Sequence, residues 1–301
     1  MKLSAKWMGL ALAGLMSLSL AACGSPAGGS AGSETTAAAS GSGAPAASDA
    51  ASGQLTGIND LKSLKLAAQR GTVGQQLAED LVGEAHTDLV TTYEKYVDAV
   101  TALTQGKVKA VIMDERPAKR FLAEIKGLSI MSEPLSNERY AIAIKKGNSE
   151  LKDQINRYLS ELKADGTLQA IIEKYNSDTE VSPSDIDLNK GAAGGRLVMG
   201  TEAGFAPYEL KIDDGYVGID IELMAAIAKK MDRELVVENM NFDALPAAVN
   251  AGKIDCVAAG LTVTPEREAN MDFTDAYVED ARQVALVMTA DYAAAAAETA
   301  K

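Results

Sequence analysis

The sequence predicts an α/β fold of two lobes, each built on a mostly parallel sheet. From residue 61 onward, short apolar runs alternate with segments whose apolar residues recur at helical spacing. This alternation is typical of parallel α/β architecture. A polar stretch at residues 177–195, containing Pro183 and closing glycines, interrupts the pattern, which then restarts. Roughly 250 residues follow the first 53, and that length suits two lobes of ordinary size.

The stretch before this linker alternates strands and helices. Its apolar runs predict strands at residues 64–69, 88–93, 108–114, 128–135 and 138–147. The periodic segments between them predict helices at residues 74–83, 96–106 and 116–127. Gly106 ends the second helix, and Pro117 fits the first turn of the third. Residues 54–141 are therefore expected to form one lobe.

Two helices follow without a strand between them, at the end of residues 142–176. The first is expected to be capped by Asn148 or Ser149 and to stop before Gly166, and the second to be capped by Thr167. Each carries an apolar stripe at helical spacing, namely Leu151, Ile155, Leu159 and Leu162, then Leu168, Ile171, Ile172 and Tyr175. We interpret both stripes as core.

After the linker, the α/β pattern predicts another lobe at residues 196–289. Strands are expected at residues 196–201, 234–240, 253–260 and 281–289. Helices are expected at residues 219–231, capped by Asp220, and at 242–252. Residues 208–218 predict a hairpin that turns at Asp214-Gly215. The motif AAGLTVTPERE at 258–268 follows the apolar run IDCVAA and places hydroxyls and a guanidinium at the end of a strand.

The two ends of the chain are expected to lie outside the lobes. Residues 1–22 have the positive start and short apolar core of a secretory signal. The ending Leu-Ala-Ala before Cys23 resembles a bacterial lipobox, which implies cleavage and lipid attachment at Cys23; the alternative is an ordinary signal with a chance cysteine. Residues 23–53 are almost wholly small or polar and predict a flexible tether, and residues 290–301 form an Ala-rich tail.

Charge and composition exclude several classes of protein. The formal charge is −13, and loss of Lys2 and Lys6 with the leader leaves 27 basic against 42 acidic residues, a charge of −15. Nucleic-acid binding needs clustered basic residues and is not expected. Cys256 lies in an apolar run and is interpreted as a small buried side chain, and His86, the only histidine, as a surface residue. We therefore expect no disulfide, no metal site and no Ser-His-Asp triad.

Several segments together resemble one known family. GTEAGFAPYELKIDDGYVGIDIELMAAIAKKM and NMNFDALPAAVNAGKIDCVAAGLTVTPEREANMDFTDAYV resemble the first lobe of amino-acid-binding proteins of ABC importers, family 3 type. LKSLKLAAQRGTVGQQLAEDL through KVKAVIMDERPAKRFL resembles the second lobe, and NSELKDQINRYLSELKADGTLQAIIEKYN resembles the C-terminal helices. The resemblance covers residues 55–289. It implies a periplasmic-binding-protein type II fold, two Rossmann-like lobes with a ligand cleft between them.

The order of the lobes departs from that family. Here the second lobe (54–141) precedes the helices of 142–176, and the first lobe (196–289) comes last. We interpret this as a circular permutation in which the linker 177–195 joins the family's usual ends. Only one covalent crossing between the lobes is then expected, near Tyr140–Ile144, with a looser hinge as the consequence. Domain swapping and a poorly folding rearrangement are the alternatives.

The resemblance assigns the carboxylate of an amino-acid ligand to the AAGLTVTPERE motif. Arg267 can hold a carboxylate through two parallel hydrogen bonds, Thr262 can add a hydroxyl, and Gly260 allows close approach of the backbone. The alternative for Arg267 is a surface ion pair with Glu266 or Glu268.

Residues of the second lobe complete the expected contacts with the ligand backbone. Gln69, Gly71 and Thr72 lie at a strand-to-helix junction, where free N–H groups favour an anion, although Thr72 can equally be a helix cap. Val73 replaces a hydroxyl residue that the family often has. Asp114 ends a strand at the usual ligand crevice and matches the residue that pairs with the ligand ammonium. Its alternative is the cap of the next helix.

The side-chain pocket is assigned by the same resemblance. Phe205 and Phe242 are expected to sandwich the ligand, with Tyr208 packed behind them. Glu202 is expected to face the head of the ligand side chain, where a carboxylate suits a cationic or amide group.

These features predict a lipid-anchored, extracytoplasmic solute-binding protein that takes an amino acid, polar or basic, to an ABC importer. The protein is expected to be a monomer that needs no cofactor and catalyses no reaction. Its expected partners are the free amino acid, the membrane subunits of the importer and the membrane itself, through the lipid on Cys23. An enzyme on the same fold, such as a dehydratase of an aromatic precursor, and a sensor lobe are the alternatives, because fold does not determine function.

Overall fold

The computed structural model describes residues 54–177, 181–213 and 215–293. All of them belong to one compact unit, Asp49–Lys301. The expected signal segment 1–22, Cys23, the tether to residue 53, Asp214 and residues 294–301 lie outside the described residues. Within the described part of the chain, no helix is long and apolar enough to cross a bilayer.

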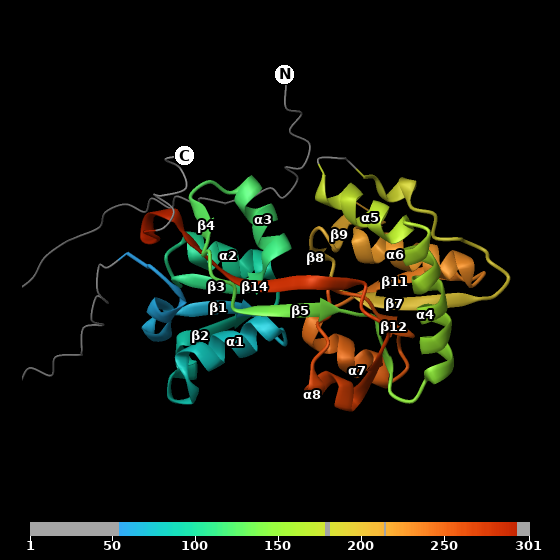
Figure 1. The fold of residues 1–301 in the computed structure, drawn as a ribbon, viewed down its shortest axis with the longest axis horizontal. Coiled ribbons are helices and arrows are strands. Elements are labelled where there is room, and N and C mark those ends of the chain that lie inside the picture. Colours follow the sequence, from blue (N-terminus) through green and yellow to red (C-terminus); the bar gives the residue numbers. More distant parts are fainter. Residues whose placement is uncertain (1–53, 178–180, 214, 294–301) are drawn as a thin grey trace, which may run out of the picture. The chain divides into compact units, whose positions relative to one another are not determined.

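A six-stranded sheet forms the second lobe (Figure 1). Three parallel strands, in the order β2-β1-β3, are followed by β14, which runs antiparallel to β3, β4 and β5. The strands are β1 (Leu66–Gln69), β2 (Val90–Tyr93), β3 (Ala110–Asp114), β4 (Leu128–Ile130), β5 (Ser136–Tyr140) and β14 (Val278–Met288). β1 and β3 are buried along their whole length, as strands covered on both faces require.

The helices of the second lobe pack on this sheet. They are η1 (Ile58–Ser63), α1 (Val73–Val82), η2 (Glu84–Leu89), α2 (Tyr96–Thr104) and α3 (Glu115–Glu124), with η5 (Thr289–Asp291) after β14. α1 and α2 both contact β1 and β3, and α3 contacts β14 and β4. His86 is exposed in η2, as expected.

A five-stranded sheet in the order β11-β7-β12-β6-β13 forms the first lobe. β11, β7 and β12 are parallel, and β6 runs antiparallel to both of its neighbours. Its strands are β6 (Ala143–Lys145), β7 (Arg196–Thr201), β11 (Glu234–Asn239), β12 (Cys256–Val257) and β13 (Met271–Phe273). A small antiparallel sheet contains β8 (Gly204–Phe205), β9 (Glu209–Ile212) and β10 (Gly215–Val217). Cys256 is buried in β12, as expected.

The helices of the first lobe are α4 (Ser149–Ala164), α5 (Thr167–Asn176), η3 (Pro183–Asp185), α6 (Ile219–Lys230), η4 (Phe242–Ala244), α7 (Leu245–Asn250) and α8 (Pro265–Asn270). Asn148 caps α4, as expected. Thr167 does not cap α5, because Gly166 occupies the cap position with a φ of 83°. The linker is not loose where it is described, since Val181 and Ile186 are buried in the core of this lobe.

Two details of the expected elements are wrong in this lobe. Asp220 is not the cap of α6, because Gly218 holds that position and Asp220 lies buried in the first turn. The strand expected over 253–260 shrinks to β12, since Gly260 adopts a φ of 53° and turns the chain. The AAGLTVTPERE motif continues into the short helix α8, which is capped by Thr264 and has Pro265 in its first turn.

The chain crosses between the two sheets twice, once from β5 to β6 and once from β13 to β14. The expected single crossing is therefore wrong, and residues 278–288 belong to the second lobe's sheet. The looser hinge inferred from a single crossing loses its basis. Leu55 forms a β-bridge with Tyr292, so the first and last described segments lie beside each other in the second lobe.

Candidate functional site

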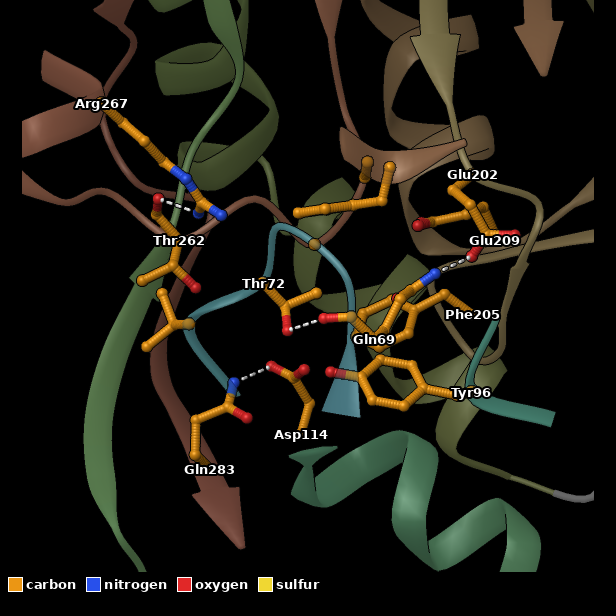
Figure 2. Close-up of a pocket in the computed structure, with 14 residues that line it drawn as sticks. Gln69, Thr72, Tyr96, Asp114, Glu202, Phe205, Glu209, Thr262, Arg267 and Gln283 are labelled. Carbon is orange, nitrogen blue, oxygen red and sulfur yellow. Dashed lines mark hydrogen bonds between the residues drawn. The ribbon is translucent and has the colours of Figure 1, made fainter. Parts of the chain in front are cut away.

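A cavity lined by residues of both lobes contains most of the expected site. Its free volume is about 10 Å³, roughly the space that one water needs. Figure 2 shows the side chains converging on it from β1, β3, β14 and the loops after β7 and β12. Its lining is Gln69, Thr72, Val73, Tyr96, Asp114, Glu202, Phe205, Glu209, Phe242, Ala259, Gly260, Thr262, Arg267 and Gln283. Of the expected site residues, only Gly71 and Tyr208 do not line it.

Arg267 points into this cavity from α8. Its Nη1 donates to the Thr262 carbonyl oxygen at 2.8 Å, and its Nη2 donates to the Gly71 carbonyl oxygen of the other lobe at 3.0 Å. The guanidinium lies 5.5 Å from the centre of the Phe242 ring. Burial lowers the pKa of Arg267, but a guanidinium still remains charged at any physiological pH. Arg267 makes these contacts and, among the described residues, forms no ion pair with Glu266 or Glu268, which was the alternative left open by the sequence.

The junction between β1 and α1 is held by its own hydrogen bonds. The Thr72 hydroxyl accepts from the Gln75 backbone N–H at 3.2 Å and donates to the Gln69 carbonyl at 2.7 Å, so Thr72 caps α1. Gln69 Nε2 donates to the Glu94 carbonyl at 2.8 Å and to Glu202 Oε2 at 3.1 Å. Gly71 has a φ of 77°, and a Cβ there would lie 3.0 Å from Asp243 Cβ. This glycine therefore permits the close approach of the two lobes.

Asp114 ends β3 with its side chain in the cavity. It occupies the cap position of α3 but makes no side-chain cap bond. Instead Oδ1 accepts from the Tyr140 hydroxyl and from Gln283 Nε2, the latter at 2.9 Å. Burial and, after it, the nearby Glu138 carboxylate raise the pKa of Asp114 to about 7, against the opposing effect of these hydrogen bonds. Asp114 is thus poised to gain a cationic partner.

Thr262 and Gly260 come from the loop after β12. The Thr262 hydroxyl donates to Glu138 Oε2 of β5 at 2.6 Å, which joins the two lobes. Gly260 N–H donates to Asp220 Oδ2 at 2.8 Å. A Cβ at Gly260 would lie 2.5 Å from the Phe205 ring, so only glycine lets this loop pass.

Two stacked rings, Tyr96 and Phe205, line one wall of the cavity, and a third ring, Tyr208, stacks behind them. Phe205 stacks on Tyr96 at 5.7 Å and on Tyr208 at 5.5 Å between ring centres. Tyr208 packs behind Phe205, as the sequence predicted, and its hydroxyl accepts from Arg116 Nη1 at 3.0 Å. Phe242 supplies a separate apolar surface of the same cavity.

Acidic side chains outnumber basic ones around this cavity. Asp114, Glu202 and Glu209 line it, whereas Arg267 is the single basic side chain among its described lining residues. Burial raises the pKa values of Glu202 and Glu209. Such a site is complementary to a ligand with one anionic group and more than one cationic or hydrogen-donating group.

Four residues in or beside the cavity were not predicted from the sequence: Tyr96, Glu138, Glu209 and Gln283. Glu138 and Gln283 are single polar residues at buried positions of strands β5 and β14. A polar residue at an inward position of a strand is the one signal that marks them. Within the described residues, no group of three or more His, Cys, Asp or Glu side chains is arranged to hold a metal ion.

Comparison with known proteins matches the model of one family to most of the chain. The family is described as bacterial extracellular solute-binding proteins, family 3, and the match covers residues 36–178 and 197–294. An arginine-binding extracellular protein of Bacillus subtilis (strain 168) is 43% identical over 91 residues, which are 30% of this chain and 36% of that protein.

Two other relatives carry different ligands in their names. A probable histidine-binding protein of Campylobacter jejuni is 40% identical over 81 residues, 27% of this chain and 32% of the relative. An ABC transporter glutamine-binding protein of Bacillus subtilis (strain 168) is 32% identical over 114 residues, 38% of this chain and 41% of the relative. Each alignment spans less than half of the relative.

Proposed function

Because the chain belongs to the bacterial extracellular solute-binding proteins of family 3, we propose that it binds a free basic amino acid for import by an ABC transporter. The observation that carries this proposal is the charge of the cavity, where the Arg267 guanidinium faces the carboxyl groups of Asp114 and Glu202. A basic amino acid presents one carboxylate and two cationic groups and matches that pattern. Names of the relatives include arginine-, histidine- and glutamine-binding proteins.

Each part of the ligand has a partner in this proposal. Arg267 and Thr262, with the N–H groups at Gly71 and Thr72, bind the carboxylate. Asp114 binds the ammonium group. Phe205 and Phe242 enclose the aliphatic part of the side chain, and Glu202, whose Oε2 is held by Gln69, binds its cationic head.

Ligand entry requires the lobes to part. A cavity of about 10 Å³ is too small for an amino acid, and the hydrogen bonds from Arg267 to Gly71 and from Thr262 to Glu138 join the lobes across it. The two crossings, from β5 to β6 and from β13 to β14, are the covalent hinge about which such opening would occur.

The finer features of the proposal concern attachment and chain order. The leader and Cys23 support lipid anchoring on the outer side of the cell membrane, and a monomer that performs no chemistry is proposed. Circular permutation is proposed from the lobe order, and the bridge between Leu55 and Tyr292 supports it, because it places the two ends of the described chain together.

Calorimetric titration of the purified protein against the twenty amino acids tests the function. We expect heat of binding with L-arginine, L-lysine or L-histidine, and its loss in Arg267→Ala and Asp114→Ala. A folded protein that binds none of the twenty would contradict the proposal. Turnover of a carboxylate-bearing aromatic precursor would instead support the enzymatic alternative.

A further inference from the structure

Two carboxyl groups meet in the interior of the first lobe, next to the cavity. The side chains of Glu209 and Asp220 are fully buried, each residue having 0% exposure. The Asp220 backbone N–H donates to the Tyr208 carbonyl at 3.0 Å, which fixes the start of α6 against the start of β9. Gly218 allows this approach: its φ is 137°, and a Cβ there would lie 2.0 Å from the Tyr208 carbonyl oxygen.

The hydrogen bonds of the pair are unevenly distributed. Asp220 Oδ2 accepts from the Gly260 backbone N–H at 2.8 Å and from the Tyr277 hydroxyl at 2.7 Å. Among the described residues, no donor reaches Asp220 Oδ1 or either oxygen of Glu209. Two buried carboxylates without a cation between them would be very costly. One proton held between them supplies the missing donor.

The groups that face the pair strengthen this reading. Glu202, in the loop after β7, and Asp114, at the end of β3, are both acidic and disfavour a second negative charge. Tyr277, in the second crossing, donates to Asp220, and Tyr208 is held by Arg116. Burial, then the charge of Asp220, raises the pKa of Glu209 well above its usual range. The pKa of Asp220 is about 6, raised by burial.

We propose that Glu209 and Asp220 share one proton at neutral pH and that this pair positions the Gly260–Thr262 segment of the ligand cavity. Glu209 acts as the donor to Asp220, which remains a carboxylate and holds the Gly260 N–H and the Tyr277 hydroxyl. The pair thereby ties the loop after β12 to the crossing between β13 and β14. These are positioning residues, since they act on the cavity through Gly260 and Tyr277.

The shared proton can be tested without any ligand. A proton kept by the folded chain and released on unfolding increases the unfolding constant about tenfold per pH unit. We would measure urea unfolding from pH 8 to 9, where Asp114, with a pKa of about 7, and Asp220, with a pKa of about 6, are almost wholly ionised in the folded chain. Glu209→Gln keeps the donor but cannot titrate, so the rise of its unfolding constant per pH unit should be about tenfold smaller than that of the wild type.

Two further variants complete this comparison. Asp220→Asn should flatten the pH dependence in the same way, because its amide can donate to an ionised Glu209 while its oxygen still accepts from Gly260. Glu238→Gln, an exposed residue, is the matched control and should keep the wild-type slope. Equal slopes in the wild type and Glu209→Gln would overturn the shared proton.

The positioning role rests on the proposed function and is tested with L-arginine as the probe. Asp220→Ala removes the acceptor of the Gly260 N–H and should weaken binding at pH 7.5 by about tenfold or more. Asp220→Asn keeps an oxygen that accepts from the Gly260 N–H, so its affinity should remain within about threefold of the wild type, less than one typical hydrogen bond. Wild-type affinity in Asp220→Ala would overturn the positioning role.

The two tests fail separately. A wild-type protein that does not bind L-arginine would contradict the basic-ligand function, whereas the pH slope of unfolding would still decide the shared proton. If Asp220→Ala does not fold, a second measurement takes its place. The affinity for L-arginine at pH 7.5 is divided by the affinity at pH 9, and this ratio is compared between the wild type and Glu209→Gln. A ratio that is larger in the wild type supports positioning, and equal ratios overturn it.

Discussion

Arg267 of the first lobe donates a hydrogen bond to the backbone carbonyl of Gly71 in the second lobe, across 3.0 Å and 196 positions of sequence. The same guanidinium donates to the Thr262 carbonyl through its other terminal nitrogen. In the proposed function, a ligand carboxylate that accepts two hydrogen bonds from Arg267 shares the guanidinium with both carbonyls. The interlobe hydrogen bond and the proposed carboxylate contact then depend on one side chain.

Replacement of Arg267 should abolish tight binding. Arg267→Ala removes two charge-assisted hydrogen bonds to the ligand, so the Kd for L-arginine should rise about 10²- to 10³-fold. Arg267→Lys keeps the charge but cannot form two parallel hydrogen bonds, so its Kd should lie between those of the wild type and Arg267→Ala. Calorimetry checks both, with the exposed Arg139→Ala as a control that should bind like the wild type. Unchanged affinity in Arg267→Ala would remove it from the site.

Ligand affinity should depend on pH through Asp114. Its pKa in the ligand-free protein is about 7, so below that pH an ammonium group must displace a proton. The Kd of the wild type should then rise by up to about tenfold for each unit below pH 7. Asp114→Asn should bind weakly and lack this pH dependence. A wild-type Kd that is constant from pH 5.5 to 8 would contradict the ammonium role.

The stability of the ligand-free protein should respond to Asp114 in the opposite sense. The folded pKa of about 7 lies above the ordinary value of about 3.9. The stabilisation from this group is therefore complete below pH 4 and is lost as the pH rises to 7. Asp114→Asn, which has no proton to lose, should unfold at a higher urea concentration than the wild type at pH 8. A lower midpoint would show that the carboxylate is stabilised in the folded chain.

Glu202 should determine the preference for a cationic head. Glu202→Gln removes the charge while keeping the size and the oxygen that accepts from Gln69. Affinity for L-arginine should fall about 10-fold or more, as for one hydrogen bond to a charged group, while affinity for L-glutamine should change less. The ratio of the two Kd values measures the effect. The exposed Glu238→Gln should leave that ratio unchanged.

Sequence patterns predicted most helices and strands well, but they did not predict which sheet each strand joins. β1 and β3 are continuous buried runs and α4 carries an apolar stripe at helical spacing. These three elements and α6 lie close to where the sequence placed them. The apolar run that forms β14 could equally have joined either sheet, because nothing local distinguishes a strand that crosses from one that does not.

Site residues could be predicted from the sequence where they belong to a recognisable motif. Asp114 ends a recognisable strand, and Thr262 and Arg267 belong to the AAGLTVTPERE motif that follows another. Glu209 and Tyr96 have no such context, and they reach the cavity only because of where β9 and α2 begin. Asp220 resembled a helix cap, and its burial depends on the close approach at Gly218, which no local pattern reveals.

A rearranged chain should bind as the natural one does. Residues 191–292 followed by a short Gly/Ser linker and residues 55–190 would undo the circular permutation that we propose. Because Leu55 and Tyr292 are bridged, the new joint spans a short distance, and such changes are tolerated at neighbouring surface ends. We expect a Kd for L-arginine within about threefold of the original, less than one hydrogen bond is worth. A protein that folds but does not bind would contradict the permuted order.

The bridge between Leu55 and Tyr292 also determines how the described chain carries mechanical load. Both ends of that chain leave from the second lobe, side by side. A pulling force applied through them is taken up at that bridge and does not pass through either crossing. The first lobe is consequently not loaded by such a force, so tension between the two ends does not oppose the proposed opening of the lobes.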